Sequence, residues 1–322
     1  MYTPHVSPVA PRATQTARAV NHQVPHYLGV ADLSAPEILD LLERALELKR
    51  DLARGETPRY LNGKTAALVF QKPSLRTRVS FEVAMLQLGG HALYLSPAEV
   101  QLGQREGVGD AARVLSRYVD TIVARVFLHS DVVDLAENAA VPVINALSDR
   151  EHPCQILADL LTLYERRGAL RGLRLAYVGD GNNVANSLAM AAGRLGIDLR
   201  FACPDGYEPD PSVLETTSTV ELFRDPREAV RKADAVYTDA WYSMGQESEA
   251  DLRAPLFRPY QVNSELLSWA SKDVLVLHCL PAHRNQEITD EVLDGPASVV
   301  YDQAENRLHA QKALLLRLLT SG

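Results

Sequence analysis

Residues 74–78 read Ser-Leu-Arg-Thr-Arg and place two guanidinium groups and two hydroxyls within five positions. They follow a short apolar run, 66–70, and open a segment in which apolar residues recur at helical spacing. A helix N-terminus offers free backbone N–H groups and partial positive charge, and ligands of open α/β sheets bind where strands end. The run therefore predicts a phosphate-binding loop, with a capped helix and solvated arginines as the alternative.

Arg125 closes another expected strand, 121–126, and the run His152-Pro153-Cys154-Gln155 opens a long expected helix. Arg125 and His152 each have an ordinary interpretation. An arginine at the end of a strand is usually a surface residue, and a histidine can make all its hydrogen bonds at an interface between elements. Together, an imidazole and a guanidinium can polarise a carbonyl group and hold a developing oxyanion. The run also lies where two domains are expected to meet, a favoured position for small-molecule sites.

A turn that contains two glycines, Gly179-Asp180-Gly181-Asn182-Asn183, joins an expected strand to an expected helix. It is similar to a dinucleotide-binding fingerprint, but the third glycine of that motif would fall at Val184. This mismatch disfavours a nicotinamide cofactor. Asn182 and Asn183 are expected to cap the helix or to hold the carboxylate or amide of a substrate.

Residues 239–245, Asp-Ala-Trp-Tyr-Ser-Met-Gly, follow another expected strand. A carboxylate at a strand end can bind the ammonium group of a substrate, which makes Asp239 a candidate for that role. A solvated loop is the alternative interpretation.

Residues 278–284, His-Cys-Leu-Pro-Ala-His-Arg, also follow an expected strand. His278, Cys279 and His283 are zinc-binding residue types, but no second cysteine pair or nearby carboxylate completes a set of four ligands. A cysteine nucleophile with a histidine base is the other possibility, although no third group that would orient the histidine is evident.

The elements that must position these residues alternate between strands and helices. A helix at 130–139, with Ser130 as its N-cap, and a long helix at 153–166 are among the expected helices, and a last helix covers 305–320. Expected strands cover 66–70, 91–95, 121–126, 141–146, 173–178, 199–203, 235–239 and 274–280, with a short last strand at 298–301. Such alternation predicts an α/β fold with two doubly wound domains and mostly parallel sheets, joined by the long helix.

The composition limits the function classes. A chain of 322 residues is long enough for two domains, and a net charge of −8 disfavours a nucleic-acid-binding protein. The apolar runs are too short to cross a membrane. Cys154, Cys203 and Cys279 lie far apart, so a reducing, cytoplasmic location is expected. Residues 1–26 are expected to form a flexible tail, with a targeting segment as the alternative.

The five runs together resemble the aspartate/ornithine carbamoyltransferase family. Its members carry Ser-Thr-Arg-Thr-Arg at the phosphate loop and His-Pro-x-Gln at the domain junction, which correspond here to 74–78 and 152–155. The ornithine-specific branch adds Asp-x-x-x-Ser-Met-Gly and His-Cys-Leu-Pro-x-His-Arg, which are found at 239–245 and 278–284. Glu-Asn-Arg at 305–307 also matches, and the resemblance extends from about residue 27 to the C-terminus.

This resemblance implies transfer of the carbamoyl group of carbamoyl phosphate to the δ-amine of L-ornithine, giving L-citrulline and phosphate in arginine metabolism. It implies no metal or other cofactor, no nucleic-acid or membrane partner, and a homotrimer or a multiple of one. It further implies a carbamoyl phosphate-binding domain at 27–150, to which the C-terminal helix 305–322 returns, and an ornithine-binding domain at 151–304.

The resemblance also assigns roles to residues. The implied catalytic residues are Arg76, Arg125, His152, Asp239 and Cys279. The implied carbamoyl phosphate ligands are Ser74, Leu75, Arg76, Thr77, Arg78, Arg125, His152, Gln155, Cys279, Leu280 and Arg307, and the implied ornithine ligands are Asn183, Asp239, Ser243, Met244, Cys279 and Leu280. Leu75 replaces the family's usual threonine, a mild change if this position contributes its backbone N–H.

Several alternatives stay open on the sequence. Sister enzymes that act on acetylornithine or putrescine would use the same chemistry with a changed pocket in the second domain. An aspartate enzyme is disfavoured because it lacks the Ser-Met-Gly and His-Cys-Leu-Pro runs. An inactive binding or regulatory subunit is disfavoured by the complete set of motifs, and a dehydrogenase by the missing third glycine.

Overall fold

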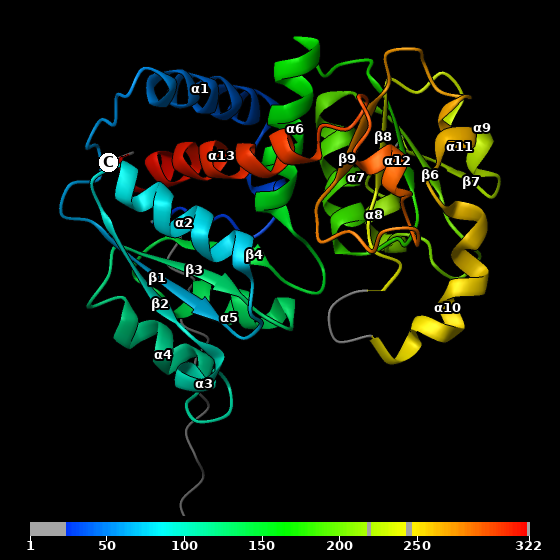
Figure 1. Ribbon diagram of the computed structural model, residues 1–322. Coiled ribbons are helices and arrows are strands. Elements are labelled where there is room, and N and C mark those ends of the chain that lie inside the picture. The colour runs from blue at the N-terminus through cyan, green and yellow to red at the C-terminus, as the bar shows by residue number, and fades with distance from the viewer. Residues whose placement is uncertain (1–23, 218–219, 243–246, 321–322) are drawn as a thin grey trace, which may run out of the picture.

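The computed structural model describes residues 24–217, 220–242 and 247–320. Most of the predicted tail at 1–26, and residues Ser243 and Met244, therefore lie outside the described residues. Figure 1 shows two α/β units side by side, with the long helix α6 (Pro153–Arg167) between them. This architecture confirms the predicted fold class.

The first sheet has the strand order β2-β1-β3-β4, and all of its pairings are parallel. Because the order reverses between β1 and β3, their carboxyl ends form the switch point at which ligands of such sheets bind. The strands are β1 (Thr65–Phe70), β2 (His91–Leu95), β3 (Thr121–Arg125) and β4 (Val143–Leu147). The helices between them are α2 (Leu75–Gln87), α3 (Pro97–Val100), α4 (Val108–Leu115) and α5 (His129–Asn138).

The second sheet has the order β7-β6-β5-β8-β9, also parallel throughout, with its switch point between β5 and β8. Its strands are β5 (Arg174–Val178), β6 (Asp198–Ala202), β7 (Val220–Phe223), β8 (Ala235–Thr238) and β9 (Leu275–His278). The helices of this unit are α7 (Asn183–Leu195), α8 (Pro211–Leu214), α9 (Pro226–Val230), α10 (Ala250–Phe257), α11 (Ser264–Leu267) and α12 (Asp290–Leu293).

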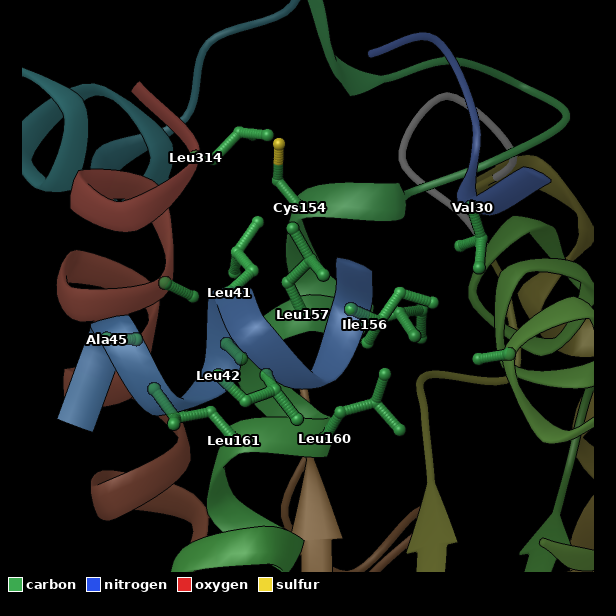
Figure 2. Close-up of a cluster of buried hydrophobic side chains, with 14 of the residues drawn as sticks. Val30, Leu41, Leu42, Ala45, Cys154, Ile156, Leu157, Leu160, Leu161 and Leu314 are labelled. Atoms are coloured by element: carbon green, nitrogen blue, oxygen red, sulfur yellow. The ribbon is translucent and has the colours of Figure 1, made fainter. Parts of the chain in front are cut away.

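Helices α1 (Ala35–Ala53), α6 and α13 (Val300–Thr320) pack together beside the first sheet. Helix α13 contacts α6, α1 and α2, as Figure 1 shows. Figure 2 shows the apolar side chains that join them, with Leu41 and Leu42 of α1 near Leu157 and Leu161 of α6. Burial of these side chains is the main force that returns the C-terminal helix to this unit and fixes α6 between the two sheets.

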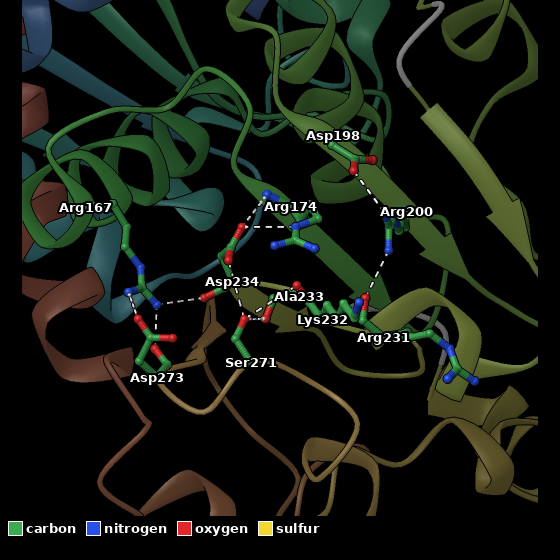
Figure 3. A network of polar contacts seen from close by, with 10 residues as sticks. All are labelled: Arg167, Arg174, Asp198, Arg200, Arg231, Lys232, Ala233, Asp234, Ser271 and Asp273. Atoms are coloured by element: carbon green, nitrogen blue, oxygen red, sulfur yellow. Dashed lines mark hydrogen bonds and ion pairs between the residues drawn. The ribbon is translucent and has the colours of Figure 1, made fainter.

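Polar contacts fix the other end of α6 to the second sheet, as Figure 3 shows. Arg167 lies 2.5 Å from the Asp273 carboxylate and donates a hydrogen bond of 3.0 Å to the carbonyl of Asp234. The Asp234 carboxylate accepts a hydrogen bond of 2.9 Å from the backbone of Arg174, at the start of β5. Helix α6 is thereby tied to both units.

Most predicted elements are found within one or two residues of their expected ends. The last helix begins at Val300, five residues before its predicted start at 305, and two further predictions are wrong. Residues 298–301 do not form a strand, because Ser298 makes only an isolated bridge to Val276 and α13 already begins at Val300. Helix α5 begins at His129 after an extended Leu128, so Ser130 is not its N-cap. In both places tertiary packing outweighs local propensity.

Several elements were not predicted, among them the long helix α1, the strand β7 and the short helices α3, α8 and α12. The described part of the chain has no helix with the length and apolar character that crossing a membrane would require.

Candidate active site

The loop at 71–74 and the first turn of α2 lie at the carboxyl end of β1. Ser74 is the N-cap of α2, and its Oγ accepts a 3.4 Å hydrogen bond from the backbone N–H of Thr77. Leu75 is 76% exposed and lies at the first helical position, where a backbone N–H has no partner within the helix. The predicted phosphate loop is thus a helix N-terminus with free donors.

Three arginines from separate elements share one region. Arg125 is the last residue of β3, Arg76 lies in the first turn of α2 and Arg307 lies on α13. Burial, together with the charges of Arg307 and Arg76, lowers the pKa of Arg125 to about 10. None of the three pairs with a carboxylate among the described residues, and Nε of both Arg125 and Arg307 lacks a hydrogen-bond partner there. This positive charge, unbalanced and largely buried among the described residues, could be compensated by an anion.

Arg307 also connects the sequence motifs to one another. Its Nη1 donates to Gln155 Oε1 at 3.0 Å, and its Nη2 donates to Thr77 Oγ1 at 2.9 Å. Arg76 Nη2 donates to the carbonyl of Leu280 in the second unit at 2.5 Å. The predicted residues of α2, α6, α13 and the loop after β9 are therefore brought together.

His152 is buried where the loop after β4 enters α6. Its backbone N–H donates to Ser187 Oγ at 2.9 Å, whereas its ring Nδ1 has no hydrogen-bond partner among the described residues. Burial, Arg307, Arg125 and Arg76 lower the pKa of this imidazole well below its usual value. His152 is therefore a neutral imidazole with a ring nitrogen available to a ligand.

Asp239 and Cys279 meet at the carboxyl ends of β8 and β9. The Cys279 thiol donates to Asp239 Oδ1 at 2.9 Å, and Asn182 Nδ2 donates to Asp239 Oδ2 at 2.7 Å. Burial and the neighbouring Asp239 carboxylate raise the pKa of the Cys279 thiol well above its usual value. Asn182, considered from the sequence only as a cap or general substrate ligand, caps α7 and also orients this carboxylate.

His278 is oriented by Glu287, a residue that the sequence did not single out, and it contacts the backbone rather than the Cys279 thiol. His278 Nε2 lies 3.1 Å from Glu287 Oε1, and His278 Nδ1 accepts from the backbone N–H of Leu280 at 2.9 Å. Ligand-type atoms of Asp239, His278 and Cys279 lie within 4.8 Å of one another. Cys279 bonds to Asp239, and both ring nitrogens of His278 are occupied by Glu287 and the backbone N–H of Leu280, so these atoms already have hydrogen-bond partners.

Two predicted residues have other contacts. Arg78 Nε lies 3.0 Å from Glu82 Oε1, and its guanidinium lies 3.9 Å from the centre of the Tyr94 ring, so its side chain does not join the arginine cluster. Asn183 Nδ2 donates to the carbonyl of Ser148 at 2.6 Å, a contact between the two units.

The fold and the site define an α/β protein with a cluster of arginines between two parallel sheets. The family model for the carbamoyl-P binding domain of aspartate/ornithine carbamoyltransferase matches residues 25–165. The model for the Asp/Orn binding domain of the same family matches residues 171–318. The chain therefore belongs to the aspartate/ornithine carbamoyltransferase family, as its motifs predicted.

Individual relatives belong to the ornithine branch. The chain is 55% identical over 300 residues to the ornithine carbamoyltransferase of Pyrococcus abyssi, which covers 91% of this chain and 95% of that protein. The anabolic ornithine carbamoyltransferase of Pyrococcus furiosus is 55% identical over 296 residues, covering 89% and 94%. The solved structure of the ornithine carbamoyltransferase from Pyrococcus furiosus has a TM-score of 0.89 at 53% identity and covers 93% of this chain and 98% of that chain.

Proposed function

We propose that this protein transfers the carbamoyl group of carbamoyl phosphate to the δ-amine of L-ornithine, giving L-citrulline and phosphate. The observation that carries the proposal is the cluster of buried Arg125 and Arg307 with half-buried Arg76, which forms no ion pair with a carboxylate among the described residues. A phosphate dianion supplies the missing negative charge, and guanidinium forks match its oxygens. The names of the relatives supply the substrates.

The phosphate end of carbamoyl phosphate is assigned to the first turn of α2. Ser74, Thr77 and the backbone N–H of Leu75 offer neutral donors, and Arg76 offers a charged fork. Leu75 can replace the family's threonine in this role because its side chain points to solvent rather than into the site. Arg78 remains only a sequence-based candidate, since its guanidinium contacts Glu82 and Tyr94.

The carbamoyl group is assigned to Arg125, His152, Gln155 and Arg307. Neutral His152 can donate one hydrogen bond to the carbamoyl oxygen, and Arg125 can stabilise the negative charge that develops on this oxygen during attack. These groups are fixed by the packing of β3 and α6, so little reorganisation is needed when the charge forms. No covalent intermediate is required.

Ornithine is assigned to the second unit. Asp239 offers a carboxylate to an ammonium group, Asn183 offers an amide, and Cys279 and Leu280 lie beside the reacting end. The sequence-based ligands Ser243 and Met244 stay part of the proposal through their motif alone, because they lie outside the described residues. Arg76 bonds to Leu280, so the two substrates are expected to meet between the two units.

The chemical difficulty is the charge of the nucleophile. An alkyl ammonium with a pKa near about 10.4 is almost entirely protonated at pH 7, so forming the neutral amine costs on the order of 4 kcal/mol. Burial and the positive charge of Arg76 and Arg125 favour the neutral amine. The amine nitrogen then bonds to the carbamoyl carbon, the bond from that carbon to the phosphate oxygen breaks, and phosphate accepts the amine proton.

The proposed domain division, cellular location and oligomeric state follow the resemblance to the family. A division into a tail at 1–26, a first domain at 27–150 with helix 305–322, and a second domain at 151–304 is part of the proposal, as is a cytoplasmic location without nucleic-acid or membrane partners. A homotrimer is supported by exposed apolar side chains on α2 and the adjoining strand β2, among them Leu86 and Leu93. The anabolic relative favours the direction of arginine biosynthesis.

The test is citrulline formation from carbamoyl phosphate and ornithine by the wild-type protein and by the Arg76→Ala variant. Loss of a positioned charged donor is expected to lower kcat/KM for carbamoyl phosphate by at least about 100-fold. Arg78→Ala is the matched comparison on the same helix and should lose much less. Equal losses for the two variants, or wild-type protein that forms no citrulline, would contradict the proposal.

A further inference from the structure

A buried carboxylate lies one helical turn beyond the HPCQ motif. Asp159 is fully buried on α6, four residues after Gln155 and therefore on the same face of the helix. It forms no ion pair with a lysine, arginine or histidine in the described part of the chain. Burying a carboxylate without such a partner costs free energy of folding, so its hydrogen bonds must compensate for the lost hydration.

The contacts of Asp159 come from three elements. Its Oδ1 accepts hydrogen bonds from Gln155 Nε2 at 2.8 Å and from Gln303 Nε2 of α13 at 2.7 Å. Its Oδ2 accepts one of 3.0 Å from the hydroxyl of Tyr237 on β8. The contacts of the Asp159 carboxylate are therefore all hydrogen-bond donors. Burial raises the pKa of Asp159 to about 7, although the positive charge of Arg307 favours the ionised form.

These contacts determine which way the Gln155 amide faces. An amide has one acceptor oxygen and one donor nitrogen, and an acceptor on one side requires the nitrogen to face it. With Nε2 directed to Asp159, Oε1 faces Arg307 and accepts from its Nη1 at 3.0 Å. A flipped amide would instead place N–H groups against the N–H groups of the guanidinium.

We propose that Asp159 is a positioning residue for the carbamoyl phosphate subsite, which holds Arg307 in place by fixing the orientation of the Gln155 amide. The inference rests on the proposed function and extends it by one residue outside the sequence motifs. Arg307 in turn bonds to Thr77, so the chain of contacts links α6 and α13 to the phosphate loop on α2. Gln303 Oε1 accepts from the backbone N–H of His278, which extends the same network to β9.

The test compares kcat/KM for carbamoyl phosphate in Asp159→Leu, which removes both acceptor oxygens at similar size, and in Asp159→Asn. The leucine variant is expected to lose about 10- to 100-fold, as for other coupled polar networks. The asparagine variant should recover most of this loss, because its oxygen can still accept from Gln155 while its Nδ2 donates to Tyr237. If Asp159→Leu does not fold, Asp159→Ala takes its place.

Thr162→Val is the matched control for a structural role. Thr162 lies on the same buried face of α6 and accepts a 3.0 Å hydrogen bond from Asn306 of α13, but its contacts do not reach Gln155. This variant should lower the melting temperature with little change in kcat/KM. Equal kcat/KM values for Asp159→Leu and Thr162→Val would overturn the inference.

A double variant tests the route through Gln155. If Asp159 acts by orienting Gln155, Asp159→Leu should cause little further loss of kcat/KM in a Gln155→Leu background. Fully additive losses, or an asparagine variant as impaired as the leucine variant, would overturn the proposed route. Wild-type protein that forms no citrulline would instead refute the proposed function, so the two failures are distinguishable.

Discussion

Arg125 and Arg307 are buried close to each other although each disfavours the charge of the other. Burial, and next the positive charges of Arg307 and Arg76, lower the pKa of Arg125, because all of them disfavour its protonated form. A bound phosphate dianion would attract the guanidinium groups and so offset their mutual repulsion. The site is thus organised before the substrate arrives, and the repulsion between the arginines becomes attraction for phosphate.

The chemistry of Cys279 gives a first prediction at the residue scale. Because burial and Asp239 raise the pKa of its thiol, Cys279 is a poor nucleophile that serves as a hydrogen-bond donor. Cys279→Ser keeps a donor, so it should retain on the order of a tenth or more of the wild-type kcat, whereas loss of a nucleophile usually costs about 1000-fold or more. Rapid-quench mass spectrometry should detect no carbamoylated cysteine, and a burst of that adduct would contradict direct attack.

Sequence reasoning found the site residues that carry recognisable motifs. Arg76, Thr77, His152 and Gln155 could be placed because a strand end followed by a helix start fixes where they lie. Asp159 could not, because an acid within an apolar helical face gives no motif. The one available signal was its spacing of four residues from Gln155, and its partner Gln303 lies 144 residues away in the sequence.

At the scale of elements, helices α6 and α13 do more than cover the first sheet. Helix α6 carries His152 and Gln155, and α13 brings Arg307 back to the phosphate loop over a long sequence separation. The apolar faces in Figure 2 hold these helices together, so packing energy is what keeps the arginine cluster assembled. A change that loosens this packing is therefore expected to affect activity as well as stability.

His309 on α13 gives a prediction about pH and stability. Burial, Lys312 and Lys49 lower the pKa of this imidazole to about 4, against about 6.5 in the unfolded chain. Because the folded protein disfavours the protonated form, the associated stability is present above pH 6.5 and is lost as the pH falls toward 4.

Urea unfolding at fixed protein concentration should show this loss. Between pH 7.5 and 5 the wild type is expected to lose about 2 kcal/mol that the His309→Leu variant does not lose. Carboxylates common to both proteins cancel in the difference. An identical pH dependence for the two proteins would contradict the assignment.

The elements themselves were predictable where local pattern and tertiary packing agree. Strands β1 and β3 were found almost residue for residue, because buried parallel strands combine short apolar runs with flanking turns. The stretch from Ser298 to Tyr301 has strand-like residues, but Val300 is buried in the first turn of α13. Its environment in the folded chain, which the local pattern does not contain, decides its conformation.

At the scale of the whole molecule, the two units supply different halves of the proposed site. Arg76 of α2 reaches Leu280 after β9, and Asn183 of α7 reaches Ser148 after β4. Carbamoyl phosphate bound to the arginines would strengthen the contact between the units and complete the place for ornithine. Carbamoyl phosphate is therefore expected to bind before ornithine.

Equilibrium dialysis can measure this order with L-norvaline, which is ornithine without its δ-amine and cannot react. Carbamoyl phosphate should tighten the binding of norvaline by at least about tenfold, within the usual range of coupling between sites. Equal affinity in the presence and absence of carbamoyl phosphate would contradict closure driven by the first substrate.

The proposed function specifies both the reaction and the amine that accepts the carbamoyl group. Acetylation of the α-amine removes the charge that Asp239 is proposed to bind, and putrescine lacks the α-carboxylate. The direct measurement is therefore steady-state carbamoylation of ornithine, acetylornithine and putrescine under identical conditions. The kcat/KM for ornithine is expected to exceed both others by at least about 100-fold, and preference for either rival, or no citrulline from ornithine, would contradict the proposed function.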